Sequence, residues 1–302
     1  MSQDALAPIG VIAHYNLLEA IDASGPGELY RARDTKRGRT VALRLLPADV
    51  AAGRPEMVEG IRSVQVLSHP NAITVFDVGE HDGRVYVVFE FLKGQSLRAE
   101  MGGRPVNPKR SVDMAIQIAD AVAEAHAAGF AHRGLSPDAI VITARGHAKV
   151  PACDLAVQNG LVSAGGEARL PDYDAPEEAR GNQPDDRSDV YSVGAILYEM
   201  LTMRRPMHRG ASAPSASNAR VSRELDAVVL KAIAPNPDSR YQSMAAFAAE
   251  LRSVAAALGL EDGGAARVGQ AAAATTSMRG VLLTTTIILA VLAAIVWWTT
   301  RP

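Results

Sequence analysis

The sequence predicts an α+β fold in two lobes, a β-rich lobe followed by a helical lobe, with one transmembrane helix near the end of the chain. Up to about residue 92, short segments alternate apolar and polar residues, which is the period of a strand. From about residue 95, apolar residues recur at the spacing of an α-helix. Strands followed by helices, rather than alternating with them, are typical of the α+β class.

The first lobe contains four candidate strands and one helix. Turn residues at His81, Asp82 and Gly83 separate the last two strands, as expected for a hairpin. The helical segment carries apolar residues at helical spacing and lies between the second and third strands. The predicted strands are 28–33, 40–46, 73–78 and 85–91, and the predicted helix is 55–67.

The second lobe is predicted to contain four main helices. The first of them stops at Gly129, a residue that commonly ends helices. The segment 207–223 is rich in Ser, Ala and Pro, so we expect a loop there. The predicted helices are 112–128, 190–201, 225–233 and 244–258.

The composition excludes several classes of partner and cross-link. A formal net charge of −2 and a pI near 6.4 give no polyanion-binding signature, so we predict no nucleic-acid partner. The single cysteine, Cys153, excludes an internal disulfide framework and favours a reducing compartment. The first residues lack a basic segment followed by an apolar run, so no signal peptide is predicted.

An apolar run near the end of the chain begins at Val281 and ends at Trp298, with no charged residue between them. Eighteen helical residues span about 27 Å, which is close to the thickness of a bilayer core of about 30 Å. The paired Trp297 and Trp298 are typical of the membrane interface. We predict a single transmembrane helix rather than a buried core helix, which is usually shorter.

These patterns divide the chain into five parts. We expect an N-terminal extension at 1–14, a folded domain at 15–255, a flexible Gly- and Ala-rich tether at 259–280, the transmembrane helix at 281–298 and a short tail at 299–302. Because no signal peptide is predicted, the folded domain should stay in the cytoplasm. We therefore expect a single-pass protein of the inner or plasma membrane.

Four motifs within the folded domain follow one another in a recognisable order. They are His-Pro-Asn at 69–71, Tyr-Asp-Ala-Pro-Glu at 173–177, Asp-Val-Tyr-Ser-Val-Gly at 189–194 and Pro-Asp-Ser-Arg-Tyr at 237–241. In this order and spacing, about 240 residues of the chain resemble the eukaryotic-like serine/threonine protein kinases of bacteria. The resemblance implies the two-lobe kinase fold. It also implies a buried ion pair between Glu177 and Arg240, and an Asp189 that holds the catalytic-loop backbone.

The catalytic loop of that family reads H-R-D-L-x-x-x-N, and residues 132–139 match it without its reactive side chains. In the family the Asp accepts the proton of the substrate hydroxyl and the Asn holds a metal ion. Here Gly134 stands at the Asp position and Ala139 at the Asn position. The resemblance implies structural roles for the retained His132 and Arg133.

The second metal-binding position is also changed. Counted without gaps from the preceding strand, the family's D-F-G aligns with Ala152, Cys153 and Asp154, which puts Ala152 at the metal-binding Asp. In the alternative register, shifted by two residues, Asp154 itself becomes the metal ligand. The ungapped register is the one we adopt, so we predict no metal site.

The nucleotide-binding positions are partly retained. Arg44 replaces the family's Lys in V-A-I-K, and a planar guanidinium does not substitute for an ammonium between two phosphates. Its partner position in the helix holds Gly60, although a local shift would bring in the adjacent Glu59. Phe89 stands where it would narrow the back of the adenine pocket. The residual nucleotide cleft would consist of Gly25, Gly27, Ala42, Arg44, Glu90 and Leu92.

These changes remove the base, both metal ligands and the Lys–Glu pair together, whereas the motifs that hold the fold are kept. The sequence therefore predicts a pseudokinase, a membrane-tethered scaffold or allosteric regulator whose partners are proteins at the membrane, such as an active kinase or envelope machinery. Two alternatives stay open: a weak or unconventional serine/threonine kinase, and a sensor that binds ATP without transferring phosphate. We expect no cofactor for the scaffold or regulator, and ATP bound without a metal ion for the sensor.

Overall fold

The structure is a computed structural model that divides into two compact units, 1–260 and 261–302. The second unit lies outside the described residues, and with it the predicted tether and transmembrane helix. No helix among the described residues is long and apolar enough to cross a bilayer. The structure describes residues 7–21, 27–48, 59, 62–132, 134–151, 173–182, 184–207 and 210–257.

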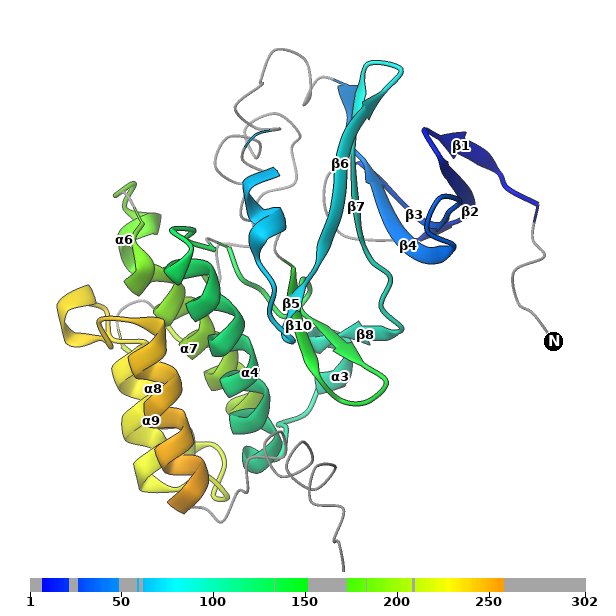
Figure 1. Ribbon diagram of the computed structural model, residues 1–302. Coiled ribbons are helices and arrows are strands. Elements are labelled where there is room, and N and C mark those ends of the chain that lie inside the picture. Colours follow the sequence, from blue (N-terminus) through cyan, green and yellow to red (C-terminus); the bar gives the residue numbers. More distant parts are fainter. Residues whose placement is uncertain are drawn as a thin grey trace, which may run out of the picture. The chain divides into compact units, whose positions relative to one another are not determined.

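The first lobe is built on an antiparallel sheet of six strands in the order β1-β2-β3-β4-β7-β6 (Figure 1). Alternate residues of β4 are buried, which explains the period-2 pattern in its sequence. The core of the lobe forms beneath it from Tyr15, Leu17, Val41, Leu43 and Val88. The strands are β1 Gly10–Ile12, β2 Tyr15–Ile21, β3 Glu28–Asp34, β4 Arg39–Leu45, β6 Val75–His81 and β7 Arg84–Glu90.

Strand β1 lies within the segment that the sequence predicts to be an N-terminal extension. It pairs antiparallel with β2, and the backbone N–H of Ile9 donates to the carbonyl of Leu17 at 2.8 Å. Ile12 is 5% exposed and belongs to the core of the lobe. The sheet therefore begins before residue 15. A three-residue strand that completes a sheet edge is too short for a periodic pattern to show.

The second lobe is mainly helical, with a small sheet of four strands in the order β5-β10-β9-β8 beside it (Figure 1). Helix α7 packs against α4, α8 and α9, and all of its residues from Ser188 to Thr202 are buried. The helices are α3 Leu97–Met101, α4 Pro108–Ala127, α6 Pro176–Ala179, α7 Asp186–Thr202, α8 Arg223–Ala232 and α9 Met244–Ala257; the strands are β5 Ala72–Ile73, β8 Gly94–Ser96, β9 Val141–Thr143 and β10 Ala148–Pro151.

Most of the predicted elements are present, with boundaries shifted by a few residues. Helix α4 starts earlier than predicted because Asn107 caps it and Pro108 occupies its first turn. Helix α7 also starts earlier, because the Asp185 side chain accepts a hydrogen bond from the N–H of Arg187. Of the predicted helix 55–67, the described part contains a 3₁₀ turn at Val64–Val66. The segment 207–223 contains one 3₁₀ turn, Pro214–Ala216, between irregular residues.

Gly27 allows the start of β3 to lie close to β4. Its φ is +87°, and a Cβ built on it would lie 2.2 Å from the carbonyl oxygen of Leu45. We expect Gly27→Ala to lower the free energy of unfolding by about 1–3 kcal/mol, measured by urea denaturation, because the backbone must move to remove the clash. Gly38→Ala is the matched control, since Gly38 also has positive φ, +63°, but nothing within 4 Å. Equal losses in the two variants would contradict the steric explanation.

Candidate functional site: the catalytic loop and cleft of a kinase fold

The loop after α4 is hydrogen-bonded to Asp189 of α7. The backbone N–H of His132 donates to Asp189 Oδ2 at 2.6 Å, and both residues are 1% exposed. His126, at the end of α4, contacts the same oxygen through Nε2 at 2.8 Å. One buried carboxylate thus joins α7, the end of α4 and the loop. This is the position that the sequence predicts for Asp189.

His132 contributes to the structure of the loop. Its Nε2 lies 3.0 Å from the carbonyl oxygen of Pro151, the last residue of β10. Because a carbonyl oxygen only accepts hydrogen bonds, Nε2 carries the proton and donates. The side chain therefore links the loop to the end of β10, and this bond directs its Nε2 at the backbone.

The two positions that the resemblance assigns to the base and to one metal ligand carry no polar side chain. Gly134 has a φ of +94°, a backbone conformation that favours glycine. Ala139 lies in a turn, where its N–H donates to the carbonyl of Ser136 at 3.2 Å, and it offers only a methyl group. Magnesium requires oxygen ligands, so these two residues do not fit the metal of a kinase. Within the described ranges, no group of three or more His, Cys, Asp or Glu is placed to hold a metal ion.

The predicted nucleotide cleft is described in part. Ala42 and Arg44 lie on β4, where Ala42 is paired with Phe89 of β7. Glu90 follows Phe89 at the end of β7, and its carboxylate accepts from Lys149 Nζ at 2.7 Å and from the N–H of Thr74 at 3.0 Å. The start of the segment that joins the lobes is therefore tied to β10 and to the β5–β6 connection by the Glu90 side chain.

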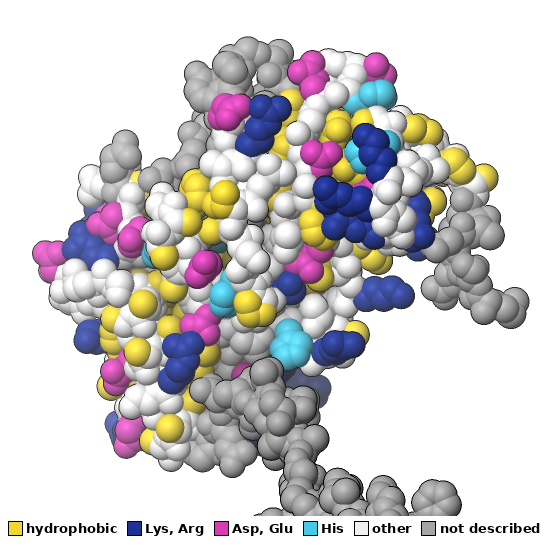
Figure 2. Space-filling view, viewed as in Figure 1, with side chains coloured by type: hydrophobic (Ala, Val, Ile, Leu, Met, Phe, Trp, Pro, Cys, Tyr) yellow, Lys and Arg dark blue, Asp and Glu magenta, His cyan; other side chains and the backbone are white. Residues whose placement is uncertain are grey.

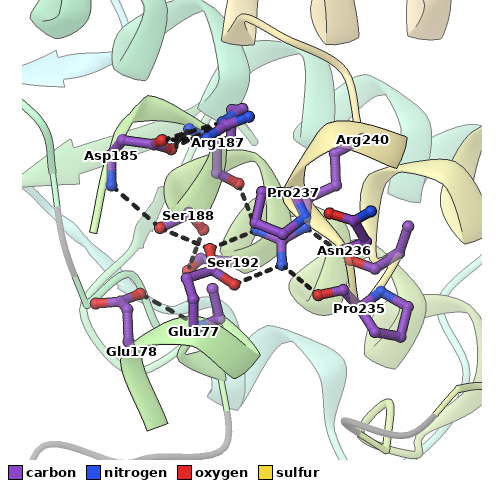
Figure 3. A network of polar contacts seen from close by, with 12 residues as sticks. Glu177, Glu178, Asp185, Arg187, Ser188, Ser192, Pro235, Asn236, Pro237 and Arg240 are labelled. Carbon is purple, nitrogen blue, oxygen red and sulfur yellow. Dashed lines mark hydrogen bonds and ion pairs between the residues drawn. The ribbon is translucent and has the colours of Figure 1, made fainter. Parts of the chain in front are cut away.

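Glu177 and Arg240 form the ion pair that the sequence predicts, and Figure 3 shows it at the centre of a polar network. Arg240 donates to both carboxylate oxygens at 2.7 Å each, and Glu177 also accepts from Ser188 Oγ at 2.9 Å. The remaining guanidinium donors reach the backbone carbonyls of Ala234 at 2.7 Å, Arg187 at 3.0 Å and Pro235 at 3.4 Å. All five N–H donors of the guanidinium are thus used.

The network changes the acidity of Glu177. Burial alone raises the pKa of this carboxyl, but hydrogen bonds from Arg240 and Ser188 outweigh burial and lower it. A folded-state pKa below the unfolded one means that the ionised group stabilises the fold above the unfolded pKa. That contribution is lost as the pH falls through the lowered pKa of the folded state.

We therefore expect the free energy of unfolding to fall as the pH is lowered below about 4.3, the ordinary pKa of Glu. The variant Glu177→Gln should be less stable at neutral pH and should lose less of its stability on acidification. Urea denaturation at a series of pH values measures both effects. A pH profile of Glu177→Gln parallel to that of the unchanged protein would contradict this assignment.

A second, partly buried network surrounds Arg98 of α3, and sequence reasoning missed it. Arg98 donates to Glu199 of α7 at 2.6 Å, and lies 3.4 Å from Asp138 of the catalytic loop. The hydroxyl of Tyr173 contacts both Arg98 and Glu199. Burial and the hydrogen bond to Glu199 raise the pKa of Tyr173 to about 12, so this phenol stays protonated. The network links the catalytic loop, the Tyr-Asp-Ala-Pro-Glu motif at 173–177 and α7.

Several of the predicted site residues lie outside the described residues. Ala42 and Arg44 lie on β4, Glu90 is the last residue of β7 and Leu92 follows it. Glu177 and Arg240 lie in the helical lobe. The structure thus separates the cleft from the buried ion pair. The predicted site residues that it does not describe are Gly25, Gly60, Arg133, Ala152 and Asp154.

The β-rich lobe, the helical lobe and the loop held by Asp189 together define a protein-kinase fold. Residues 15–256 match the model of the protein kinase domain family, and the chain therefore belongs to that family. The kinase domain of PknI from Mycobacterium tuberculosis has a similar structure, with a TM-score of 0.68 at 24% identity, covering 82% of this chain and 99% of that one. At this identity the likeness concerns the fold.

Curated relatives are closer in sequence. A probable serine/threonine-protein kinase of Streptomyces coelicolor is 34% identical over 255 residues, which cover 76% of this chain and 38% of that protein. The serine/threonine-protein kinase PknB of Mycobacterium tuberculosis is 33% identical over 265 residues, which cover 78% and 42%. The chain therefore spans about two fifths of the length of these relatives.

Proposed function

We propose that this chain is a membrane-tethered pseudokinase, which acts by binding protein partners rather than by transferring phosphate. The observation that carries the proposal is the contrast within one loop. Its backbone is held by the buried Asp189, whereas the base and metal positions hold Gly134 and Ala139. Phosphoryl transfer depends on positioning and on neutralising charge, largely through metal ions, so losing these groups together removes most of the catalytic effect.

The retained parts support a role in binding. The Glu177–Arg240 pair and the Arg98 network maintain a fully packed helical lobe, which a partner could recognise. The proposed partners are proteins at the membrane, such as an active kinase or envelope machinery. The tether and the apolar run 281–298 would hold the domain on the cytoplasmic face of the inner or plasma membrane.

Nucleotide binding by the full chain in detergent tests the proposal. We expect magnesium or manganese to add no thermal stabilisation in the presence of ATP, because the described metal position carries a methyl group. A shift with ATP alone would indicate the sensor that binds nucleotide without transfer. The variant Ala42→Phe, which fills the cleft beside Phe89, identifies whether such a shift arises there. Metal-dependent stabilisation by ATP, followed by incorporation of labelled phosphate, would overturn the proposal.

A second candidate, an unconventional serine/threonine kinase, is favoured by the relatives, which are named serine/threonine-protein kinases. In that case Asp154, Glu59 and Arg44 would take over the roles of the missing groups. Phosphate transfer that is lost in Asp154→Ala, but retained in Asp174→Ala, would establish this activity. If neither the variants nor the unchanged chain transferred phosphate, the proposed role in binding protein partners would remain.

A further inference from the structure

A cluster of basic side chains lies on the hairpin that joins β3 and β4. Among residues 31–39 there are five basic residues and one acidic residue, a formal charge of +4. The whole chain carries −2, so everything outside this segment carries −6. Figure 2 shows Lys and Arg side chains gathered on the surface over β2, β3 and β4. The basic residues of this basic hairpin are Arg31, Arg33, Lys36, Arg37 and Arg39.

The one acidic residue of the basic hairpin points inward. Asp34 is 1% exposed and accepts hydrogen bonds from the backbone N–H groups of Lys36 at 3.1 Å and Arg37 at 3.0 Å. Its carboxylate also lies 3.4 Å from Arg39 Nε. Burial raises the pKa of Asp34, but these bonds and His14 outweigh it and keep the group ionised. Asp34 therefore organises the turn from within, and leaves Lys36 and Arg37 exposed to solvent.

Two further arginines of the basic hairpin make defined contacts with neighbouring side chains. Arg39 stacks on Phe76, with its guanidinium carbon 3.5 Å from the ring centroid, which fixes the cation beside the turn. Arg31, in the middle of β3, is paired with Glu19 at 2.7 Å. The tip of the hairpin thus presents the exposed cations of Lys36 and Arg37 on a turn that hydrogen bonds to Asp34 hold in place. Exposed cations of this kind suit a partner with many negative charges on its surface.

The length of chain between the domain and the apolar run indicates that the negatively charged partner is the membrane. Residues 258–280 separate the last described helix from the apolar run, a length of 23 residues. If this segment is the flexible tether that the sequence predicts, its root-mean-square span is about 26 Å and its greatest extension about 80 Å. A domain of this size has a radius of gyration of about 18 Å, so any of its faces can reach the bilayer. The charge of each face then decides which face of the domain contacts the bilayer.

We propose that the basic hairpin binds the anionic headgroups of the membrane that holds the apolar run, and so orients the domain on the bilayer. The inference rests on the membrane tether of the proposed function. Anionic leaflets attract juxtamembrane basic residues, and the attraction is screened within about one Debye length, about 8 Å at physiological salt. Docking of the hairpin would leave the helical lobe directed away from the headgroups, available to protein partners.

The test uses the full chain in nanodiscs of phosphatidylcholine, with or without phosphatidylglycerol, and amide hydrogen exchange at residues 31–39. We expect slower exchange only in the anionic nanodiscs, and a return to the neutral-lipid rate at high salt. The variant Lys36→Gln/Arg37→Gln should lower the docking equilibrium constant by roughly 30-fold, at about fivefold per charge. Lys109→Gln/Arg145→Gln is the matched control, since it removes one exposed Lys and one exposed Arg of the helical lobe.

Each outcome has a distinct meaning. A chain that enters both nanodiscs with the same exchange at the basic hairpin keeps its tether and overturns the docking proposal. A chain that enters neither overturns the tether and the docking with it. Protection by an acidic polypeptide such as polyglutamate, in the absence of any lipid effect, would assign the hairpin to an acidic protein and also overturn the proposal.

Discussion

Replacement of Arg240 by leucine is expected to lower the free energy of unfolding by about 3–5 kcal/mol, because it leaves the Glu177 carboxylate buried without its counter-charge. Arg240 is 2% exposed and Glu177 is 8% exposed, so water cannot replace the guanidinium without opening the helical lobe. The backbone carbonyls of Ala234 and Arg187 lose their donors at the same time. Urea denaturation followed by circular dichroism measures the loss.

Two comparisons separate the buried charge from lost packing. Arg187→Leu removes a neighbouring arginine whose ion-pair partners Asp185 and Asp238 are 50% and 81% exposed, and should cost less than about 1 kcal/mol. The double variant Glu177→Leu/Arg240→Leu removes both charges and should recover part of the stability. The stability of Arg240→Lys should lie between those of the unchanged protein and Arg240→Leu, since an ammonium has three donors where the guanidinium uses five. A double variant less stable than Arg240→Leu would contradict the buried-charge explanation.

The ion pair shows what a motif can predict. Glu177 and Arg240 are 63 residues apart, and no local pattern joins them; each was assigned through the motif in which it stands. The Arg98 network is of the same kind, with partners 40 and 101 residues away, but Arg98 belongs to none of the motifs used. Long-range polar contacts are predictable from one sequence only where a family pattern names both partners.

The sheet and the helices were predictable for a different reason, because burial of one face imposes a period. Helix α7 is the limit of that rule, since all its residues from Ser188 to Thr202 are buried and most of those from Val190 onward are apolar. The short β1 has no period to read. The burial of Asp34 likewise depends on tertiary structure. The alternating pattern along β3 predicts on which face of the sheet Asp34 lies, but it does not predict the hydrogen bonds that satisfy its buried charge.

The residues that maintain the fold are distinct from those that would perform chemistry. Asp189 and Arg240 reach backbone groups of the loop and of the helical lobe, whereas Gly134 and Ala139 contribute only backbone to theirs. The contacts that maintain this part of the fold thus do not depend on side chains at positions 134 and 139. The proposed function depends on this separation, which the next substitution tests at the catalytic loop itself.

Replacement of Asp189 by alanine is expected to lower the free energy of unfolding by about 2–6 kcal/mol, since it removes the acceptor of two buried donors at about 1–3 kcal/mol each. These donors are the backbone N–H of His132 and His126 Nε2, at 2.6 and 2.8 Å. The amide of His132 should also exchange its hydrogen faster. Asp189→Asn keeps an acceptor oxygen without the charge, so its loss of stability should be smaller.

The control is Asp186→Ala, one turn earlier on the same helix. Asp186 is 56% exposed and lies 3.8 Å from His126 Nδ1, so its removal should cost less than about 1 kcal/mol. It should also leave exchange at His132 unchanged, because Asp186 does not contact that amide. If Asp189→Ala destabilised the chain without faster exchange at His132, the carboxylate would stabilise α7 and α4 alone, and the loop would owe its conformation to other contacts. In that case the Asp189 carboxylate would not be the group that maintains the loop.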